Sequence, residues 1–459
     1  MDKPKEACGV MGISSPSKSS LGKLCYLGLI SLQHRGQDSA GITISTNGKL
    51  KTEKALGLVT EAFRGKDTSS WVGEVVIGHT RYSTTGEVSL VNSQPVERVF
   101  GSNTIALAHN GNLINTAELK ELLKNEGEEL KTSTDSEIIL ALITKNAHKG
   151  LVEAVTLAMN LVKGSFSLVI ISGNKLIGVR DSWGIRPLCL GVLDDGSYAL
   201  ASESCAIDVI GGKLIRDVNP GEIIVLESNT AKKEVELSAH KYSKDKVQAP
   251  CAFESIYFSR PDSVMRGQEL FQFRKECGRL LYNQSPIKAD LVLGVPDSGI
   301  AAAIGVSEES GIAFSLGLIK NKYLGRSFIE PTEEMRKHLV SLKFNPLRSE
   351  IDNKRILLVD DSLVRGTTSK KLIDILRKAG AAEVHLYSAS PPVKHPCFFG
   401  IDLPTKKDLI AVRLSSVEKI CSKIGADSLT YLSLENLSQA LGGESHCAGC
   451  FSGTYPKLD

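Results

Sequence analysis

Two adjacent carboxylates, Asp360 and Asp361, follow a run of four apolar residues at 356–359. Such a run predicts a strand that is buried on both faces, as in a parallel sheet. The segment 362–368 that follows is rich in hydroxyl groups, and a helical pattern begins after it. A loop of this kind offers backbone N–H groups to a phosphate, while paired acids suit a diol or Mg²⁺. The spacing therefore predicts a site for a phosphorylated ribose at the carboxyl end of a strand.

The whole run 356–368 resembles the phosphoribosylpyrophosphate (PRPP) signature of type I phosphoribosyltransferases. An isolated Asp-Asp pair would more often be a solvated turn, and the surrounding run is what favours a ligand site. The resemblance implies that Asp360 and Asp361 hold the ribose hydroxyls, with Mg²⁺ nearby. It also implies that the 5′-phosphate lies against the loop formed by Val364, Arg365, Gly366, Thr367 and Thr368.

A second loop, Val295-Pro-Asp-Ser-Gly-Ile300, follows another apolar run. It resembles the loop with which the same family approaches pyrophosphate, which implies that Asp297 and Gly299 bind PRPP. Ser298 would then join the two acids around Mg²⁺. The composition is equally typical of an ordinary turn. Between the two loops lies the cation-rich segment 320–345, interpreted as a lid over PRPP or, alternatively, as a surface loop.

Cys8 stands at the start of an apolar, strand-like run near the N-terminus. Alone it would be expected to be a buried core cysteine. Four segments follow it in order, at 34–41, 78–86, 109–112 and 132–137. Together with Cys8 they resemble the glutamine amidotransferase domain of the N-terminal-nucleophile class.

That chemistry needs a thiol nucleophile and a base. If residues 1–7 are removed as a propeptide, Cys8 carries an α-amino group whose pKa of about 7.7–8.0 suits a base at neutral pH. The sequence therefore predicts cleavage between Ala7 and Cys8. A Cys-His pair or a zinc site built from His34, His79 and His109 is the less favoured alternative, because the amine leaves no role for them.

The resemblance also implies roles in binding glutamine. Arg81 would bind the α-carboxylate through its planar fork, and Asp135 would bind the α-ammonium. The side chain of Asn110 and the N–H of Gly111 would form the oxyanion hole. Taken alone, Arg81 could belong to a surface ion pair, and Asn-Gly could be an ordinary turn.

A Cys-x-x-Cys pair, Cys447 and Cys450, lies near the end of the chain. This spacing serves zinc, iron–sulfur clusters and redox dithiols, and a pair without any metal also stays open. One branch of the amidotransferases has both a propeptide and an iron–sulfur cluster, and residues 1–7 fit that branch. The resemblance implies one [4Fe-4S] cluster held by Cys251, Cys397, Cys447 and Cys450. The other cysteines are expected to be core thiols: Cys25, Cys189, Cys205, Cys277 and Cys421.

These residues need two kinds of domain to position them. Short strand-like runs alternate with Gly-rich turns and helical stretches up to about residue 235, which predicts layered sheets covered by helices. Strand–helix alternation after residue 290 predicts a parallel, doubly wound sheet. The expected fold is α/β and α+β, an αββα glutaminase followed by a phosphoribosyltransferase. The expected parts are a propeptide at 1–7, the glutaminase at 8–240, a connection at 241–265, the transferase at 266–420 and a helical tail with cluster ligands at 421–459.

Bulk composition agrees with an ordinary globular enzyme. The 459 residues are 42% hydrophobic and 23% charged, and the net charge of +3 gives no nucleic-acid footprint. No apolar run reaches the roughly 18 residues that a membrane span needs. The N-terminus has no apolar signal region, so the expected compartment is the cytoplasm, where cysteines stay reduced.

The order of the motifs resembles that of the glutamine-dependent PRPP amidotransferases. The resemblance implies that glutamine and PRPP become 5-phosphoribosylamine, glutamate and pyrophosphate, the first step of de novo purine synthesis. It further implies feedback by purine nucleotides and a homotetramer. One rival is a glutamine-dependent sugar-phosphate aminotransferase, which would carry sugar-isomerase domains. Another is a non-enzymatic regulator, which would have no reason to keep the four glutamine-site residues together.

Overall fold

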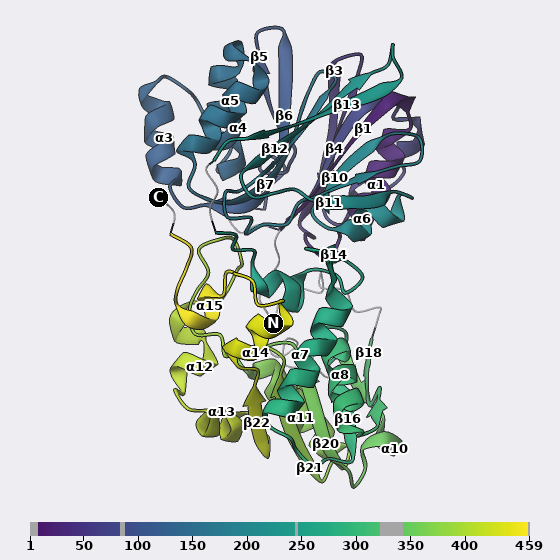
Figure 1. The fold of residues 1–459 in the computed structure, drawn as a ribbon, viewed down its shortest axis with the longest axis vertical. Coiled ribbons are helices and arrows are strands. Elements are labelled where there is room, and N and C mark those ends of the chain that lie inside the picture. Colours follow the sequence, from purple (N-terminus) through teal and green to yellow (C-terminus); the bar gives the residue numbers. More distant parts are fainter. Residues whose placement is uncertain (1–7, 83–87, 244–246, 322–342, 458–459) are drawn as a thin grey trace.

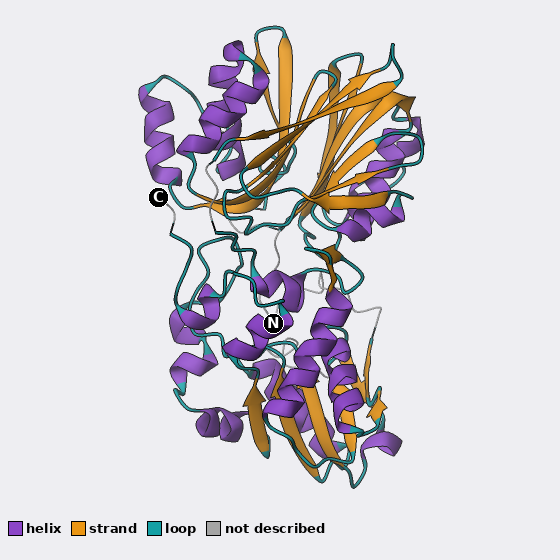
Figure 2. Cartoon of the chain, in the orientation of Figure 1, coloured by secondary structure: helices purple, strands orange, loops and turns teal. Residues whose placement is uncertain are grey.

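The computed structural model describes residues 8–82, 88–243, 247–321 and 343–457. Two sheets face each other in the N-terminal half, and helices cover their outer faces (Figures 1 and 2). The first sheet has seven strands in the order β11-β9-β10-β1-β4-β2-β3. Their bounds are β1 Gly9–Ser19, β2 Ser39–Thr46, β3 Lys49–Leu56, β4 Gly73–Arg81, β9 Cys189–Val192, β10 Tyr198–Ala201 and β11 Lys213–Asp217.

The second sheet has six strands in the order β13-β12-β8-β7-β6-β5. Their bounds are β5 Val96–Phe100, β6 Asn103–Leu113, β7 Gly164–Ser172, β8 Lys175–Arg180, β12 Glu222–Asn229 and β13 Glu234–Lys241. A buried apolar layer lies between the sheets, with Val10 and Ile77 from one and Val169 and Ile224 from the other.

Helices cover the outer faces of both sheets. The first sheet packs against α1 Leu21–Ser31, α2 Val59–Ala62 and α6 Ser204–Val209. The second packs against α3 Thr116–Asn125, α4 Asp135–Asn146 and α5 Leu151–Leu161. Short 3₁₀ turns lie at Thr68–Ser70 and Ala147–Lys149. The predicted αββα layering is therefore confirmed, because each sheet buries one face against its partner and one against helices.

A five-stranded parallel sheet forms the centre of the C-terminal half, in the order β17-β16-β20-β21-β22. Its strands are β16 Leu291–Gly294, β17 Phe314–Ser315, β20 Arg355–Asp360, β21 Glu383–Ser388 and β22 Ser428–Tyr431. In chain order this is the arrangement 2-1-3-4-5, whose direction of winding reverses between β16 and β20. Ligands of doubly wound sheets bind at that reversal, outside the carboxyl ends of the strands.

Side chains of β20 point alternately into two separate cores. Leu357 and Val359 lie with α7 Leu270–Gln284 and α8 Ile300–Ser310, whereas Ile356 and Leu358 lie with α11 Thr367–Lys378 and α13 Val417–Ile424. The strand is thus buried on both faces, and the prediction of a doubly wound sheet is confirmed.

The remaining elements are short. They are a π-helical turn at Glu254–Phe258, β14 Val264–Met265, β15 Gln268–Glu269, β18 Leu318–Lys320, β19 Phe344–Pro346, α10 Arg348–Ile351, a 3₁₀ turn at Lys406–Asp408, α12 Ile410–Arg413, α14 Leu434–Ala440 and α15 Gly449–Ser452. Among the described residues, no helix is long and apolar enough to cross a membrane.

The prediction of a helical tail at 421–459 needs correction. Residue 421 lies inside α13, and β22 is the edge strand of the transferase sheet, paired in parallel with β21. Leu429 and Tyr431 bury their side chains in the same core as Leu358. The four residues of β22 lie between two helical patterns and are too few to show the apolar–polar alternation of a strand. Their structure is decided by pairing with β21.

Candidate active sites

Cys8 lies at the start of β1, beside the end of β4. The two strands are antiparallel, with Gly9 opposite Thr80, so the thiol comes close to Arg81. Cys8 Sγ donates a hydrogen bond of 3.5 Å to the carbonyl of Tyr82. Burial raises the pKa of the Cys8 thiol above its ordinary value, although the charges of Arg81 and Arg186 oppose this. A buried thiol of this kind is protonated at neutral pH and needs a base before it can attack.

Two opposite charges lie in the neighbourhood of the thiol. Arg81 is the last residue of β4 and is buried. Asp135 is the first residue of α4, and its carboxylate accepts a hydrogen bond of 3.1 Å from the backbone N–H of Leu113. Burial alone would raise the pKa of Asp135, but the charge of His109, 3.5 Å away, and hydrogen bonds lower it. The carboxylate therefore stays ionised and suits an ammonium group, as Arg81 suits a carboxylate.

Asn110 and Gly111 belong to β6 and do not form a turn. They pair with Ser167 and Phe166 of β7, and β6 packs against β1 and β4. The Asn110 side chain is fully buried, and both its amide atoms are without a hydrogen-bond partner among the described residues. A buried amide in this state can donate to an oxyanion.

The three histidines have other partners. His34 lies 2.7 Å from a carboxylate oxygen of Glu203. A ring nitrogen of His79 lies 3.0 Å from the carbonyl oxygen of His109, and burial lowers the pKa of His79 to about 3. A ring nitrogen of His109 lies 3.5 Å from the carboxylate of Asp135 and 3.3 Å from the hydroxyl of Ser136, so each of the three rings contacts a group other than the Cys8 thiol.

Arg35 is a residue of the glutamine site that the sequence did not single out. Its guanidinium is buried and donates to the carbonyl of Cys8 at 3.1 Å. It also pairs with Glu203 and, at 2.7 Å, with Glu254 in the connection between the halves. Arg186 joins the same carboxylate of Glu254 at 3.0 Å. Arg35 lies within the segment 34–41, which the sequence analysis included in the resemblance without giving this residue a role. No local pattern indicated Arg186.

The two predicted PRPP loops meet at the winding reversal of the transferase sheet. Val295 directly follows β16 and Val359 is the penultimate residue of the parallel strand β20, and the N–H of Val295 donates to the carbonyl of Val359 at 2.9 Å. The Ser298 hydroxyl donates to one carboxylate oxygen of Asp361, and the Ser362 hydroxyl donates to the other at 2.6 Å. Hydroxyl and carboxylate oxygens are thus gathered where α/β sheets bind ligands.

The rest of the second loop leads into α11. Gly366 is the residue before the helix and has a left-handed φ of 82°. Arg365 and Thr367 are exposed, whereas the side chain of Val364 is buried in the core, so only its backbone can face a ligand. Asp297 is exposed and forms an ion pair with Lys320.

The interpreted lid lies largely outside the described residues, at 322–342. Its two ends are described: β18 pairs with β19 as an antiparallel ribbon. The proposed cleavage point after Ala7 also lies next to residues that the structure does not describe.

The four predicted cluster cysteines come from three segments. Cys251 and Cys447 form a parallel β-bridge, and Cys450 lies in α15, one turn from Cys447. The N–H of Phe399 donates to Cys397 Sγ at 3.3 Å. Burial raises the pKa of Cys447 to about 11, and burial likewise raises the pKa of the other three thiols. Four of the remaining five cysteines, Cys25, Cys189, Cys205 and Cys277, are buried, and Cys421 is half-buried.

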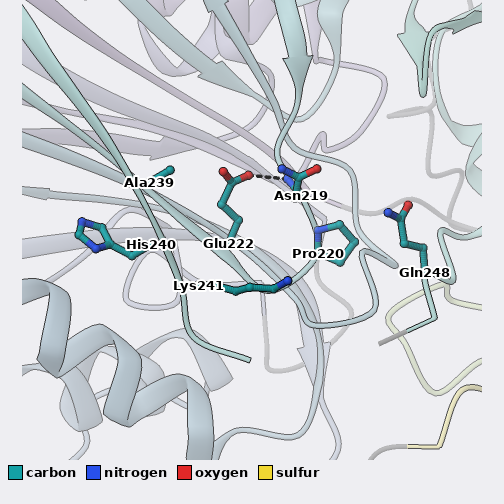
Figure 3. A pocket seen from close by; sticks show the side chains of 7 residues that line it. All are labelled: Asn219, Pro220, Glu222, Ala239, His240, Lys241 and Gln248. Atoms are coloured by element: carbon teal, nitrogen blue, oxygen red, sulfur yellow. Dashed lines mark hydrogen bonds between the residues drawn. The ribbon is translucent and has the colours of Figure 1, made fainter. Parts of the chain in front are cut away.

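A surface pocket lies away from all of these groups, next to β12 and β13 (Figure 3). It has a cavity volume of about 290 Å³ and is lined by Asn219, Pro220, Glu222, Ala239, His240, Lys241 and Gln248. None of the predicted site residues lines it, so it is distinct from the sites described above.

Comparison with known proteins agrees with the division of the chain into a glutaminase-like half and a transferase-like half. A profile described as a glutamine amidotransferase domain matches residues 79–209, and one described as a phosphoribosyl transferase domain matches residues 268–390. A curated amidophosphoribosyltransferase from Synechocystis sp. is 48% identical over 99% of this chain and 92% of its own.

Two solved structures are also similar. One is described as glutamine PRPP amidotransferase from B. subtilis complexed with ADP and GMP; it has a TM-score of 0.90, 41% identity, and coverage of 98% of this chain and 97% of that chain. The other is described as the allosteric regulatory enzyme of purine biosynthesis, with a TM-score of 0.91, 41% identity and the same coverage.

The fold and the matches define a glutamine amidotransferase domain joined to a phosphoribosyltransferase domain. The chain belongs to the amidophosphoribosyltransferase family. The second domain argues against the sugar-phosphate aminotransferase, which would carry sugar-isomerase domains there.

Proposed function

We propose that the chain hydrolyses glutamine at Cys8 and transfers the ammonia to PRPP, giving 5-phosphoribosylamine, glutamate and pyrophosphate. One observation carries this proposal: the thiol of Cys8 lies near two opposite charges, Arg81 and Asp135, that match the two ends of an amino acid. The second half supplies the acceptor, because paired acids and a phosphate-type loop lie at the winding reversal of its sheet.

In the first half-reaction, Cys8 Sγ bonds to the side-chain carbonyl carbon of glutamine. The thiol proton passes to the base, and charge develops on the carbonyl oxygen. The Asn110 amide and the Gly111 N–H would donate to this oxygen, and such donors are worth roughly 100-fold to 1000-fold in rate. On collapse, the C–N bond breaks, the protonated base gives its proton to the leaving nitrogen, and ammonia departs. Water then hydrolyses the thioester to glutamate.

The base is proposed to be the α-amino group of Cys8 after residues 1–7 are removed. The raised pKa of the thiol makes a base necessary, and the rings of the three nearby histidines contact Glu203, the His109 carbonyl and Asp135. An amine at the same residue can reach the thiol proton without any further side chain.

In the second half-reaction, ammonia attacks ribose C1 of PRPP and pyrophosphate leaves. Asp360 and Asp361 would hold the ribose hydroxyls. The loop 364–368, with the start of α11, would take the 5′-phosphate. Asp297 and Gly299 belong to the loop that would approach the pyrophosphate.

The oxygen donors of the second site fit Mg²⁺. Ser298, Asp360 and Asp361 offer one hydroxyl and two carboxylates, and Mg²⁺ is commonly held by one or two carboxylates plus substrate phosphates. When bound, the ion would neutralise the charge of the departing pyrophosphate.

The four thiols fit one [4Fe-4S] cluster held by Cys251, Cys397, Cys447 and Cys450. Within the described ranges no three His, Cys, Asp or Glu side chains converge on a single metal ion. A [4Fe-4S] cluster would instead be held by four cysteine thiolates, which these four residues would supply. Phe253, Phe399 and Phe451 belong to the same buried core as the thiols, and the N–H donated to Cys397 is a contact typical of cluster sulfurs. The cluster would tie the connection, the transferase half and the chain end together.

Regulation and assembly are proposed by similarity. The B. subtilis structure is described with ADP and GMP, so purine nucleotides are proposed as feedback ligands of this chain as well. A homotetramer is proposed from the family resemblance.

The proposal is tested by Cys8→Ser in the purified protein. Glutamine-dependent synthesis of phosphoribosylamine should disappear, whereas synthesis from added ammonia and PRPP should persist. Intact-mass analysis of active wild type should show a chain beginning at Cys8, and an active enzyme that retains residues 1–7 would refute the amine base.

A further inference from the structure

A short segment of the transferase half, residues 398–402, lies directly against the strands that carry the proposed glutamine site. The carbonyl of Phe398 accepts a hydrogen bond of 3.0 Å from the Asn112 side chain, next to Gly111 on β6. The carbonyl of Phe399 accepts a hydrogen bond of 2.8 Å from the Ser165 hydroxyl of β7. Two successive backbone carbonyls therefore join this segment to the strand with the proposed oxyanion hole and to its neighbour.

Gly400 makes the closest approach. A Cβ atom at this position would lie 3.3 Å from the carbonyl carbon of Gly111, 3.2 Å from Asn112 Cβ and 2.6 Å from a terminal nitrogen of Arg186. The residue also has a φ of 86°, a conformation that L side chains rarely adopt. Any side chain here would have to displace the guanidinium of Arg186 or shift the segment away from Gly111 and Asn112.

The same segment reaches the nucleophile from a second side. Arg186, fully buried, donates to the Phe399 carbonyl at 2.6 Å and to Glu254 at 3.0 Å. Glu254 pairs with Arg35, which holds the carbonyl of Cys8. At the other end of the segment, the Tyr82 hydroxyl lies 3.5 Å from Asp402, and the Tyr82 carbonyl accepts from the Cys8 thiol.

We propose that residues 398–402 are a positioning element, supplied by the transferase half, that sets the distance between Cys8 and the oxyanion donors. Gly400 is its central positioning residue. The proposal rests on the proposed glutaminase role of Cys8. The element begins directly after Cys397, a proposed cluster ligand, so its position is tied to that anchor.

The geometry predicts which kinetic constant changes. Arg81 at the end of β4 and Asp135 at the start of α4 would bind the two ends of glutamine, so the proposal expects the affinity for the ground state to be kept. The carbonyl oxygen becomes charged only as the reaction proceeds, so a displaced donor lowers kcat more than it changes KM.

The test compares Gly400→Ala with Gly311→Ala in the full-length protein. Gly311 has a left-handed φ of 71° and no atom within 4 Å of a Cβ built on it, so its variant carries the backbone strain alone. Gly400→Ala should lower kcat for glutamine-dependent glutamate release roughly 10-fold to 100-fold, as expected for a catalytic donor displaced by part of an ångström. KM for glutamine should change by less than about threefold, and ammonia-dependent synthesis should stay within about twofold of wild type.

One further variant, together with the activity of the wild type, keeps the outcomes distinct. Asn112→Ala removes one of the two carbonyl contacts without adding bulk and should lower kcat in the same direction by a smaller factor. A lower rate of glutamate release in Gly400→Ala than in Gly311→Ala, with ammonia-dependent synthesis retained, supports the proposal. Equal rates in the two glycine variants, or equal loss of both activities, would overturn it. Failure of wild type to release glutamate would instead overturn the proposed function.

Discussion

The Nε atom of Arg35 donates a hydrogen bond of 3.1 Å to the backbone carbonyl of Cys8. The same guanidinium pairs with Glu203 of the glutaminase half and Glu254 of the connection, and all three side chains are buried. The nucleophile is therefore held by a charged network that also reaches the transferase half, through Arg186 and the Phe399 carbonyl.

Arg35→Lys should destabilise the protein and impair glutamine hydrolysis. A lysine keeps the charge but lacks the planar fork that joins three acceptors, so one carboxylate loses its partner. Removing one partner of a buried ion pair lowers the free energy of unfolding by roughly 3–5 kcal/mol. Because lysine keeps the positive charge, we expect a decrease near the lower value. Urea unfolding of Arg35→Lys against the exposed control Arg64→Lys measures it, and equal midpoints would contradict the prediction.

Asp360→Asn should separate the two halves functionally. The carboxylate is buried at the end of β20 and is proposed to hold ribose hydroxyls, and loss of a charged hydrogen bond costs about 1.5–3 kcal/mol, or roughly 10-fold to 150-fold in rate. PRPP-dependent synthesis should fall by this factor, while basal glutamate release without PRPP remains. Asp374→Asn, on the exposed side of α11, is the matched control. Equal loss of both activities in Asp360→Asn would refute the division of labour.

Iron content tests the four proposed cluster ligands. Wild type purified without oxygen should be brown and contain about four iron atoms per chain. Cys450→Ser should lose most of that iron, whereas Cys421→Ser, whose thiol donates to a backbone carbonyl at 3.1 Å, should keep it. A colourless wild type without iron would refute the assignment.

His79 should make the glutaminase half less stable in mild acid. Burial lowers the pKa of His79 from about 6.5 to about 3, so at intermediate pH the unfolded chain binds a proton that the folded chain does not. Its contribution is fully present above about pH 6.5 and is lost as pH falls toward 3, by at most about 1.4 kcal/mol per pH unit.

The measurement is urea unfolding of wild type and His79→Gln between about pH 7 and about pH 5.5. Between these two pH values the free energy of unfolding should fall by roughly 1 kcal/mol less in His79→Gln than in wild type. His148→Gln, at an exposed position, controls for loss of a titrating group. Identical pH dependence in wild type and His79→Gln would contradict the prediction.

Local patterns predicted much of the fold. The alternation of strand-like runs with helical stretches predicted the layered N-terminal half, and the apolar run at 356–359 is a strand buried on both faces. β22 could not be predicted, because four residues carry no distinctive pattern.

A candidate site could be predicted from the sequence where one segment carries its own chemistry, as at 360–368. Contacts between distant segments were not, because nothing local in Arg186 or Phe399 indicates that residues more than 200 positions apart join through a hydrogen bond of 2.6 Å. The positioning element at 398–402 therefore emerged only from the structure.

The most direct test of the account is anaerobic glutamate release from glutamine, measured with and without PRPP and Mg²⁺. We further expect a coupling of the two halves, in which PRPP binding is transmitted to Cys8 through the contacts of residues 398–402, Arg186 and Arg35. It predicts that PRPP with Mg²⁺ raises the rate in wild type, and that this stimulation is lost in Asp360→Asn. Glutamate release that is the same with and without PRPP would contradict the central claim that ligand binding in one half governs chemistry at Cys8 in the other.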